Sequence, residues 1–218
     1  MEEKISSGCD VVDELIEGYK PVINIIYGPA ASGKTTLAML AAIEQSRKGK
    51  KIIFIDTEKG FSVERLKQLC PDDFENVLYN IMIFRVNSFA EQAEKVSKIK
   101  ELVKTGKIAL VVVDTIGIYY RLKLKEDAYK ANKAIDLQLS TLASIAREGI
   151  PVILTEQVYD NLNGQIALVG GEMLKNWSKC LIELEKDNSK RRIVIRKPEE
   201  HKGQKQEFEI KEKGIFKK

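Results

Sequence analysis

One stretch decides the fold of this chain: Gly28-Pro29-Ala30-Ala31-Ser32-Gly33-Lys34-Thr35. It matches the pattern GxxxxGK[ST] at every fixed position. The β-branched run Val22–Tyr27 precedes it, and a helical pattern of apolar residues begins near Gly33. A strand, a glycine loop and a helix in this order let backbone N–H groups and the positive end of a helix dipole surround a phosphate. The stretch therefore predicts a nucleotide site at the end of a buried strand.

The expected nucleotide-binding residues are the loop and the threonine after it: Gly28, Pro29, Ala30, Ala31, Ser32, Gly33, Lys34, Thr35 and Thr36. We expect Lys34 to reach the β- and γ-phosphates of ATP and Thr35 to offer its hydroxyl to Mg²⁺. Asp114 ends the most continuously apolar run, Ile108–Val113, where a carboxylate can hold Mg²⁺ through water. ATP and Mg²⁺ are therefore the expected ligands.

Glu58 stands just beyond a second strand pattern, Lys51–Asp56. A glutamate displaced past a strand end can reach over a γ-phosphate and polarise a water. It can equally be a solvated acid in a turn. Spacing alone leaves these two interpretations open.

Strand and helix patterns alternate along most of the chain. Helical patterns cover Phe89–Lys104 and about Asp127–Arg147, and a further strand pattern covers Val152–Gln157. Continuous β-branched runs are typical of parallel strands buried on both faces. After Gly171 the patterns indicate antiparallel strands at Cys180–Glu185, Arg191–Arg196 and Gln206–Ile210. The predicted fold is α/β: a P-loop NTPase core with a mostly parallel twisted sheet flanked by helices, and antiparallel strands at the C-terminal end.

The composition, with 44% hydrophobic and 31% charged residues, is that of a soluble globular protein. Its 218 residues predict a single domain, 1–218. No apolar run approaches the roughly 20 residues that a bilayer span needs, and the acidic N-terminus is not followed by an apolar segment, so we expect a cytoplasmic chain without membrane contact. Cys9, Cys70 and Cys180 lack metal-ligand spacing, so we interpret them as buried hydrophobic residues.

The net charge of +4 is too mild to prove a polyanionic partner, but its distribution is uneven. Lys186–Lys218 holds twelve basic and six acidic residues, and Arg121–Lys133 holds five and two. The five basic residues of the second segment are Arg121, Lys123, Lys125, Lys130 and Lys133, and the tyrosines among and beside them are Tyr119, Tyr120 and Tyr129. Both a solvated Lys-rich surface and a nucleic-acid surface with stacking rings fit this pattern.

Four motifs together resemble the core ATPase of the RecA family of recombinases, especially its archaeal RadA branch. They are the glycine loop, Ile53-Phe-Ile-Asp-Thr-Glu-Lys-Gly-Phe61, Val111-Val-Val-Asp114 and Thr155-Glu-Gln-Val158, in the family's order and spacing. The resemblance covers nearly the whole chain and implies a RecA-like fold. It also implies a catalytic set of Lys34, Glu58 and Gln157. Lys34 binds phosphate, Glu58 activates water, and Gln157 senses the γ-phosphate and relays its presence to the second DNA-binding loop.

The resemblance further implies partners. They are single- or double-stranded DNA, with the first DNA-binding loop at residues 121–133, a full-length RadA-type recombinase, and other recombination proteins. Arg196 and Lys197 stand where one recombinase protomer caps its neighbour's nucleotide, so a contact to the γ-phosphate in trans is one interpretation. A basic strand end that faces solvent is the other.

Several departures from the family pattern bear on function. The core pattern begins almost at Met1, so we expect neither the family's N-terminal helical DNA-binding domain nor its Phe-x-x-Ala polymerisation peptide. The nearest candidate for that peptide, Phe89-Ala-Glu-Gln92, has Gln in place of the last alanine. The second loop, Val158–Val169, is short and has no basic residue. The chain therefore looks most like a paralogue of RadA, and we expect a monomer or dimer rather than a long filament.

Three functions remain open. The first is an ATP- and DNA-binding protein that assists or regulates homologous recombination and DNA repair, with weak DNA-dependent ATP hydrolysis. The second is an active DNA-dependent ATPase that performs strand exchange, which the complete set of catalytic positions favours. The third is a RecA-like signalling ATPase outside DNA repair, against which the basic segment 121–133 argues.

Overall fold

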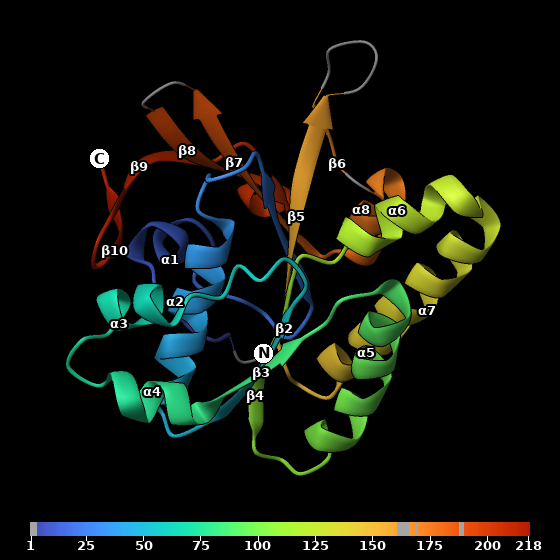
Figure 1. Cartoon of the computed structure of the whole chain (residues 1–218). Coiled ribbons are helices and arrows are strands. Elements are labelled where there is room, and N and C mark those ends of the chain that lie inside the picture. Colours follow the sequence, from blue (N-terminus) through green and yellow to red (C-terminus); the bar gives the residue numbers. More distant parts are fainter. Residues whose placement is uncertain (1–3, 161–165, 169, 188–189) are drawn as a thin grey trace.

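The computed structural model describes residues 4–160, 166–168, 170–187 and 190–218. Ten strands within these ranges form one sheet (Figure 1). Nine of them follow the order β10-β9-β8-β7-β1-β5-β4-β2-β3, and β6 pairs with β5. The strands are β1 (Ile23–Gly28), β2 (Lys51–Asp56), β3 (Ile81–Arg85), β4 (Ile108–Asp114), β5 (Val152–Asp160), β6 (Ile166–Leu168), β7 (Cys180–Asp187), β8 (Lys190–Lys197), β9 (Lys205–Lys211) and β10 (Gly214–Lys217). The α/β class predicted from the sequence is confirmed, as are antiparallel strands after β7.

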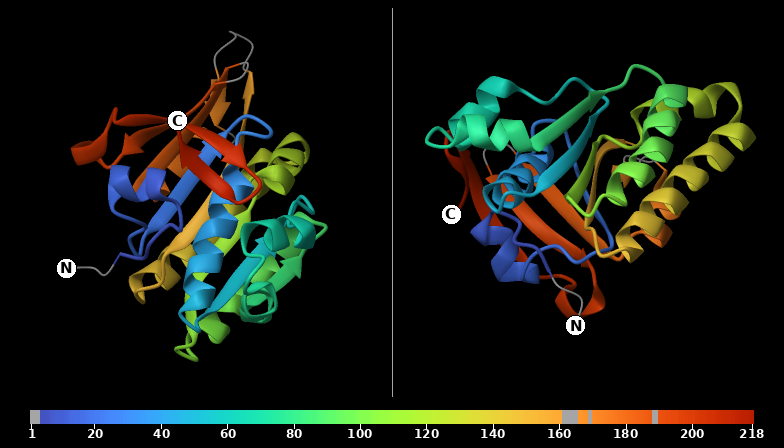
Figure 2. Two further views of the ribbon diagram at one scale, coloured as in Figure 1. Left: turned by 90° about the vertical axis from the view of Figure 1, so that its left-hand side faces the viewer. Right: turned by 90° about the horizontal axis from the view of Figure 1, so that it is seen from below.

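Helices cover both faces of the sheet (Figures 1 and 2). They are α1 (Asp10–Ile16), α2 (Lys34–Arg47), α3 (Val63–Leu69), α4 (Phe74–Asn80), α5 (Phe89–Val103), α6 (Ile118–Glu126), α7 (Ala128–Arg147) and α8 (Gly171–Trp177), with a 3₁₀ turn at Glu199–His201. α1 to α4 pack on one face and α5 to α8 on the other. The chain thus has three layers.

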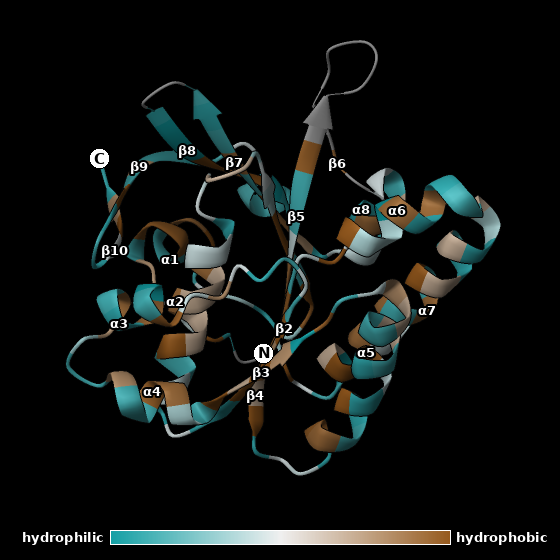
Figure 3. Cartoon of the chain, viewed as in Figure 1, coloured by the Kyte–Doolittle hydropathy of each residue, from teal (hydrophilic) through white to brown (hydrophobic). Residues whose placement is uncertain are grey.

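The period of two along a strand divides the core into two clusters. In β2, Ile52 and Phe54 face the α1–α4 cluster, whereas Ile53 and Ile55 face the α5–α8 cluster. Because both faces are covered, successive residues of the central strands are apolar. Figure 3 shows this contrast, with hydrophobic colour on β4 and mixed colours along the outer helices.

The two longest helices, α5 and α7, each begin at a residue whose side chain caps the helix. The hydroxyl of Ser88 accepts a hydrogen bond from the N–H of Glu91 at the start of α5, and Asp127 accepts one from Lys130 at the start of α7. Both helices lie within a residue of their predicted bounds. None of the helices in the described ranges is long and apolar enough to cross a bilayer.

Register in the parallel part of the sheet positions the site. Asp56 of β2 lies beside Asp114 of β4, and Gly28 of β1 lies beside Gln157 of β5. The carboxyl ends of four parallel strands therefore meet at one edge, where α/β sheets bind ligands.

Candidate nucleotide site

The glycine loop joins β1 directly to α2, and two glycines make its course sterically possible. A Cβ on Gly28 would stand 2.4 Å from the carbonyl oxygen of Leu184. Gly33, which caps α2, has φ +113°, a left-handed conformation that favours glycine. The loop therefore leads straight into a helix N-terminus, where N–H groups are free for an anion.

Lys34 is folded back onto this loop. Its Nζ donates hydrogen bonds to the carbonyl oxygens of Gly28, at 2.9 Å, and of Pro29, at 2.8 Å, and the residue is 7% exposed. Burial lowers the pKa of the Lys34 ammonium, while the carboxylates of Asp114 and Glu58 act against this. Phosphate oxygens are stronger acceptors than neutral carbonyls, so the ammonium can exchange its partners for a phosphate.

Asp114 and Thr35, both expected at Mg²⁺, are in direct contact. The Thr35 hydroxyl donates to Oδ2 of Asp114 at 2.8 Å, and the Thr155 hydroxyl donates to Oδ1. Asp114 is 3% exposed, and burial raises the pKa of its carboxyl. A hydroxyl and a carboxylate beside a phosphate loop are the oxygen donors that Mg²⁺ uses, so these residues fit the ion.

Glu58 lies across the pocket from Lys34 and is held by two neighbours. Nε2 of Gln157 donates to both carboxylate oxygens of Glu58, at 3.0 and 2.8 Å, and the Thr115 hydroxyl donates to Oε1 at 2.9 Å. Residues 30–36, Glu58, Asp114 and Gln157 line one pocket of about 420 Å³ together with Ile210 of β9. The expected catalytic, nucleotide and metal residues thus gather in one place.

Glu156 is a member of the site that the sequence interpretation missed. It is 1% exposed, and burial raises the pKa of its carboxyl to about 8. Its Oε1 accepts a hydrogen bond from the N–H of Gln157 at 2.8 Å, and a Cβ on Gly117 would stand 2.2 Å from its Oε2. The available sequence signal was a glutamate that follows Thr155 at the end of the apolar run Val152–Leu154.

The basic residues proposed for DNA lie on helices. Arg121, Lys123 and Lys125 belong to α6, and Lys130 and Lys133 to α7. Lys123 pairs with Glu126 at 2.6 Å and Lys130 with Asp127 at 3.1 Å. Within the described ranges no ion pair joins Arg121, Lys125 or Lys133 to an acidic group, so these three cations are the ones open to a phosphate backbone.

The tyrosines near this cluster differ in exposure. The Tyr119 hydroxyl donates to the carbonyls of Thr57 and Val86, and Tyr120 is 5% exposed with its hydroxyl on Asn132. Tyr129 is 76% exposed. Stacking on bases is therefore open to Tyr129, whereas Tyr119 and Tyr120 act in packing.

Arg196 and Lys197 have partners within their own chain. Arg196 pairs with Glu183, and its Nη2 lies 3.5 Å from Oε1 of Glu185. Nζ of Lys197 donates to the carbonyls of Lys175 and Ser178 at the end of α8. A contact in trans requires these bonds to open. The centre of the expected second DNA loop, residues 161–165 and 169, lies outside the described residues.

The cysteines are buried, as expected. Cys9, Cys70 and Cys180 are free and buried, and burial raises the pKa of each thiol. Among the described side chains, no group of three or more His, Cys, Asp or Glu is placed to hold a metal.

Comparisons with known proteins agree on one group. The model of the Rad51 family matches residues 3–218. The DNA repair and recombination protein RadB of Methanococcus maripaludis is 37% identical over 212 residues, covering 94% of this chain and 96% of the relative. RadB of Methanocaldococcus jannaschii is 38% identical over 200 residues, covering 90% and 93%. A solved structure described as the RadB recombinase has a TM-score of 0.82 at 33% identity and covers 97% of this chain and 98% of its own.

Proposed function

Because this chain belongs to the Rad51 family, among its RadB DNA repair and recombination proteins, we propose that it binds ATP with Mg²⁺, binds DNA, and assists or regulates a full-length RadA-type recombinase. In this proposal it hydrolyses ATP weakly. Lys34 and the loop N–H groups bind the phosphates, Thr35 and Asp114 hold Mg²⁺, and Glu58 polarises water. Mg²⁺, when bound, supplies positive charge to the phosphates.

The contact between Gln157 and Glu58 carries the proposal. The Glu58 carboxylate already accepts two hydrogen bonds from the Gln157 amide and one from the Thr115 hydroxyl, so these donors occupy the lone pairs that a water would need. A phosphate that draws the Gln157 amide away would release Glu58. Hydrolysis is then slow until the site is fully assembled, which suits a switch better than a fast motor.

An active strand-exchange ATPase is the second candidate. It is supported by the same observation that all the catalytic positions line one pocket. The recombination proteins among the relatives favour either of these functions over a signalling ATPase.

The test of nucleotide binding is an equilibrium titration with a fluorescent ATP analogue and Mg²⁺. Lys34→Ala removes a charged donor, and hydrogen bonds to charged groups contribute roughly 1.5–3 kcal/mol, so affinity should fall about 10- to 150-fold. Lys50→Ala, an exposed lysine before β2, is the control and should bind as the wild type does. Equal affinity of the Lys34→Ala variant and the wild type would place the phosphate site elsewhere.

The test that separates the two functions uses a full-length RadA-type recombinase. A regulator should retain that recombinase in a pull-down when ATP is present, and the Lys34→Ala variant should not. It should also give no strand exchange by itself. Strand exchange by this chain alone would favour the second candidate.

A further inference from the structure

A second pocket lies at the opposite end of the sheet from the nucleotide site. It has a volume of about 720 Å³ and is bounded by the start of β1, the end of α7, the turn at Gly149, and the segment from the end of α8 to Lys179. Backbone hydrogen bonds from Lys179 to Ile23 and from Val152 to Val22 close the sheet beneath it. The pocket therefore lies at the edge of the core and is separate from the proposed ATP site.

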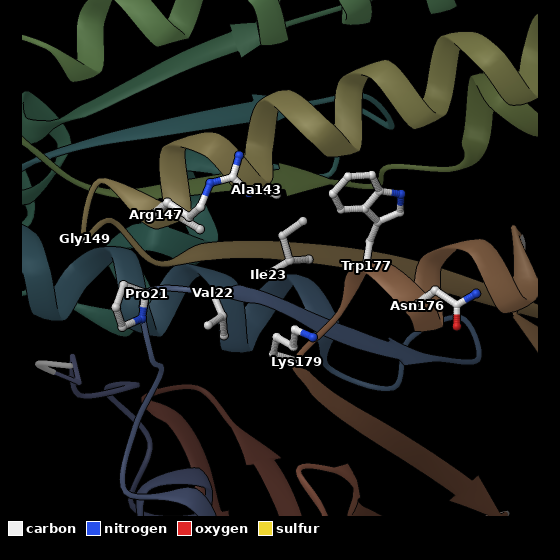
Figure 4. Close-up of a pocket in the computed structure, with 10 residues that line it drawn as sticks. Pro21, Val22, Ile23, Ala143, Arg147, Gly149, Asn176, Trp177 and Lys179 are labelled. Atoms are coloured by element: carbon white, nitrogen blue, oxygen red, sulfur yellow. The ribbon is translucent and has the colours of Figure 1, made fainter. Parts of the chain in front are cut away.

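The floor of this pocket is apolar and its aromatic wall is fixed. Val22, Ile23 and Ala143 line it, and Trp177 stands at one side (Figure 4). The indole Nε1 of Trp177 donates to Oδ1 of Asp136 on α7 at 2.9 Å. Because that bond satisfies the polar edge of the ring, the rest of the indole offers apolar surface to an occupant.

The rim of the pocket is cationic. Arg147 and Lys179 are exposed, and Figure 4 places them with Trp177 around Ile23. Neither forms an ion pair or a side-chain hydrogen bond with any described residue, whereas nearby Lys175 pairs with Glu172 at 2.8 Å. An apolar floor between two uncompensated cations is complementary to a large apolar group flanked by carboxylates.

We propose that this pocket docks a partner protein through an acidic peptide segment that carries one large apolar side chain. The apolar side chain enters between Ile23 and Trp177, and flanking carboxylates pair with Arg147 and Lys179. A DNA strand suits the pocket less well, because its phosphates need a row of cations and its bases gain nothing from an aliphatic floor.

Trp177 is the only tryptophan of the chain, so its fluorescence reports on the pocket directly. The probe is an end-blocked hexapeptide of two glutamates, serine, phenylalanine and two glutamates. The comparison probes replace its phenylalanine by alanine, replace its glutamates by lysines, or use a dodecamer of deoxythymidine. We expect a saturable change in Trp177 emission with the first peptide, at least tenfold weaker binding of the alanine peptide, and weakening by salt.

The matched variants reverse charge. Arg147→Glu with Lys179→Glu should weaken binding of the acidic peptide at least tenfold and strengthen binding of the lysine peptide. Lys50→Glu with Lys67→Glu, both exposed and outside the pocket lining, should change neither affinity. Circular dichroism checks that each variant is folded. The proposal is overturned if the acidic peptide gives no saturable change, if both double variants bind it equally, or if the oligonucleotide binds the pocket more tightly than the peptide.

Discussion

Replacing Glu156 by Gln should make the stability of this protein less dependent on pH. The Glu156 carboxyl is buried and accepts the N–H of Gln157 at 2.8 Å. Burial is the main reason that its pKa lies near 8 rather than 4.5; the charge of Glu58 adds to the rise, and the N–H groups of Gln157 and Gly117 and the ammonium of Lys34 oppose it.

The direction in which stability changes with pH follows from proton binding. Between pH 4.5 and about 8 the folded state holds a proton on Glu156 that the unfolded state has lost, so the free energy of unfolding falls as pH rises through this window. At about 1.4 kcal/mol per pH unit, the full loss is on the order of 4 to 5 kcal/mol, and about 3 kcal/mol of it falls between pH 6 and 9. Glutamine stays neutral, so the free energy of unfolding of the Glu156→Gln variant does not fall in this way.

The assay is urea unfolding followed by circular dichroism from pH 6 to 9, without nucleotide. Other buried acids, such as Asp114, titrate in both proteins and cancel in the difference. With a slope near 3 kcal/mol per molar urea, the variant should gain about 1 M in midpoint over the wild type from pH 6 to pH 9. Glu94→Gln, at an exposed glutamate, is the control. Parallel midpoints for wild type and Glu156→Gln would refute the reasoning, because the carboxyl would then titrate as in water.

Three further predictions concern the proposed chemistry. Glu58→Gln should lower steady-state ATP turnover at least tenfold while the affinity for a fluorescent ATP analogue stays unchanged, since only the water-activating group is lost; equal turnover would make Glu58 a turn residue. Neutralising Arg121, Lys125 and Lys133 together should weaken DNA binding and reduce the salt slope by up to about three in fluorescence anisotropy, and an unaltered slope would move the DNA surface elsewhere. Arg196→Ala should remove any rise of specific ATPase activity with protein concentration if Arg196 acts in trans; wild-type and variant curves of the same shape would exclude that role.

The parts of the fold that the sequence predicted are those in which each strand contains its own apolar run. β1, β2, β4 and β5 carry β-branched residues that are buried on both faces, and a glycine loop follows the first of them. The helices α5 and α7 have clear apolar faces and capping side chains at their starts. Local pattern and tertiary burial agree in these elements, so local reasoning sufficed.

Local reasoning was weaker where an element is short or depends on its neighbours. β3 has five residues at the sheet edge and owes its strand form to pairing with β2. α1, α3, α4 and α8 have seven residues each, too few for a helical period to stand out. The segment expected as a DNA-binding loop is largely helical, in α6 and the start of α7, because Tyr120, Ala131 and Ile135 pack into the core beneath it.

In the candidate site, too, local sequence predicted some features and tertiary structure determined the others. The glycine loop and Asp114 could be found from spacing, since each motif lies within one stretch of chain. The contact between Glu58 and Gln157 joins residues 99 apart in the sequence, and it depends on how β2, β4, β5 and β1 are ordered. Residue spacing does not contain that order, so only the resemblance to a family placed both residues at the nucleotide, and their direct contact was not predicted.

The position of Gly117 connects the nucleotide site to the basic helix. Gly117 caps α6, and the Glu156 carboxyl occupies the space that a side chain there would need. One turn later, Arg121 borders a small pocket that Glu58 and Gln157 also line. Because Glu156 also accepts the backbone N–H of Gln157, the end of β5 that carries Gln157 packs directly against the start of α6. The candidate nucleotide site and the first turn of α6 thus share one packed group of side chains.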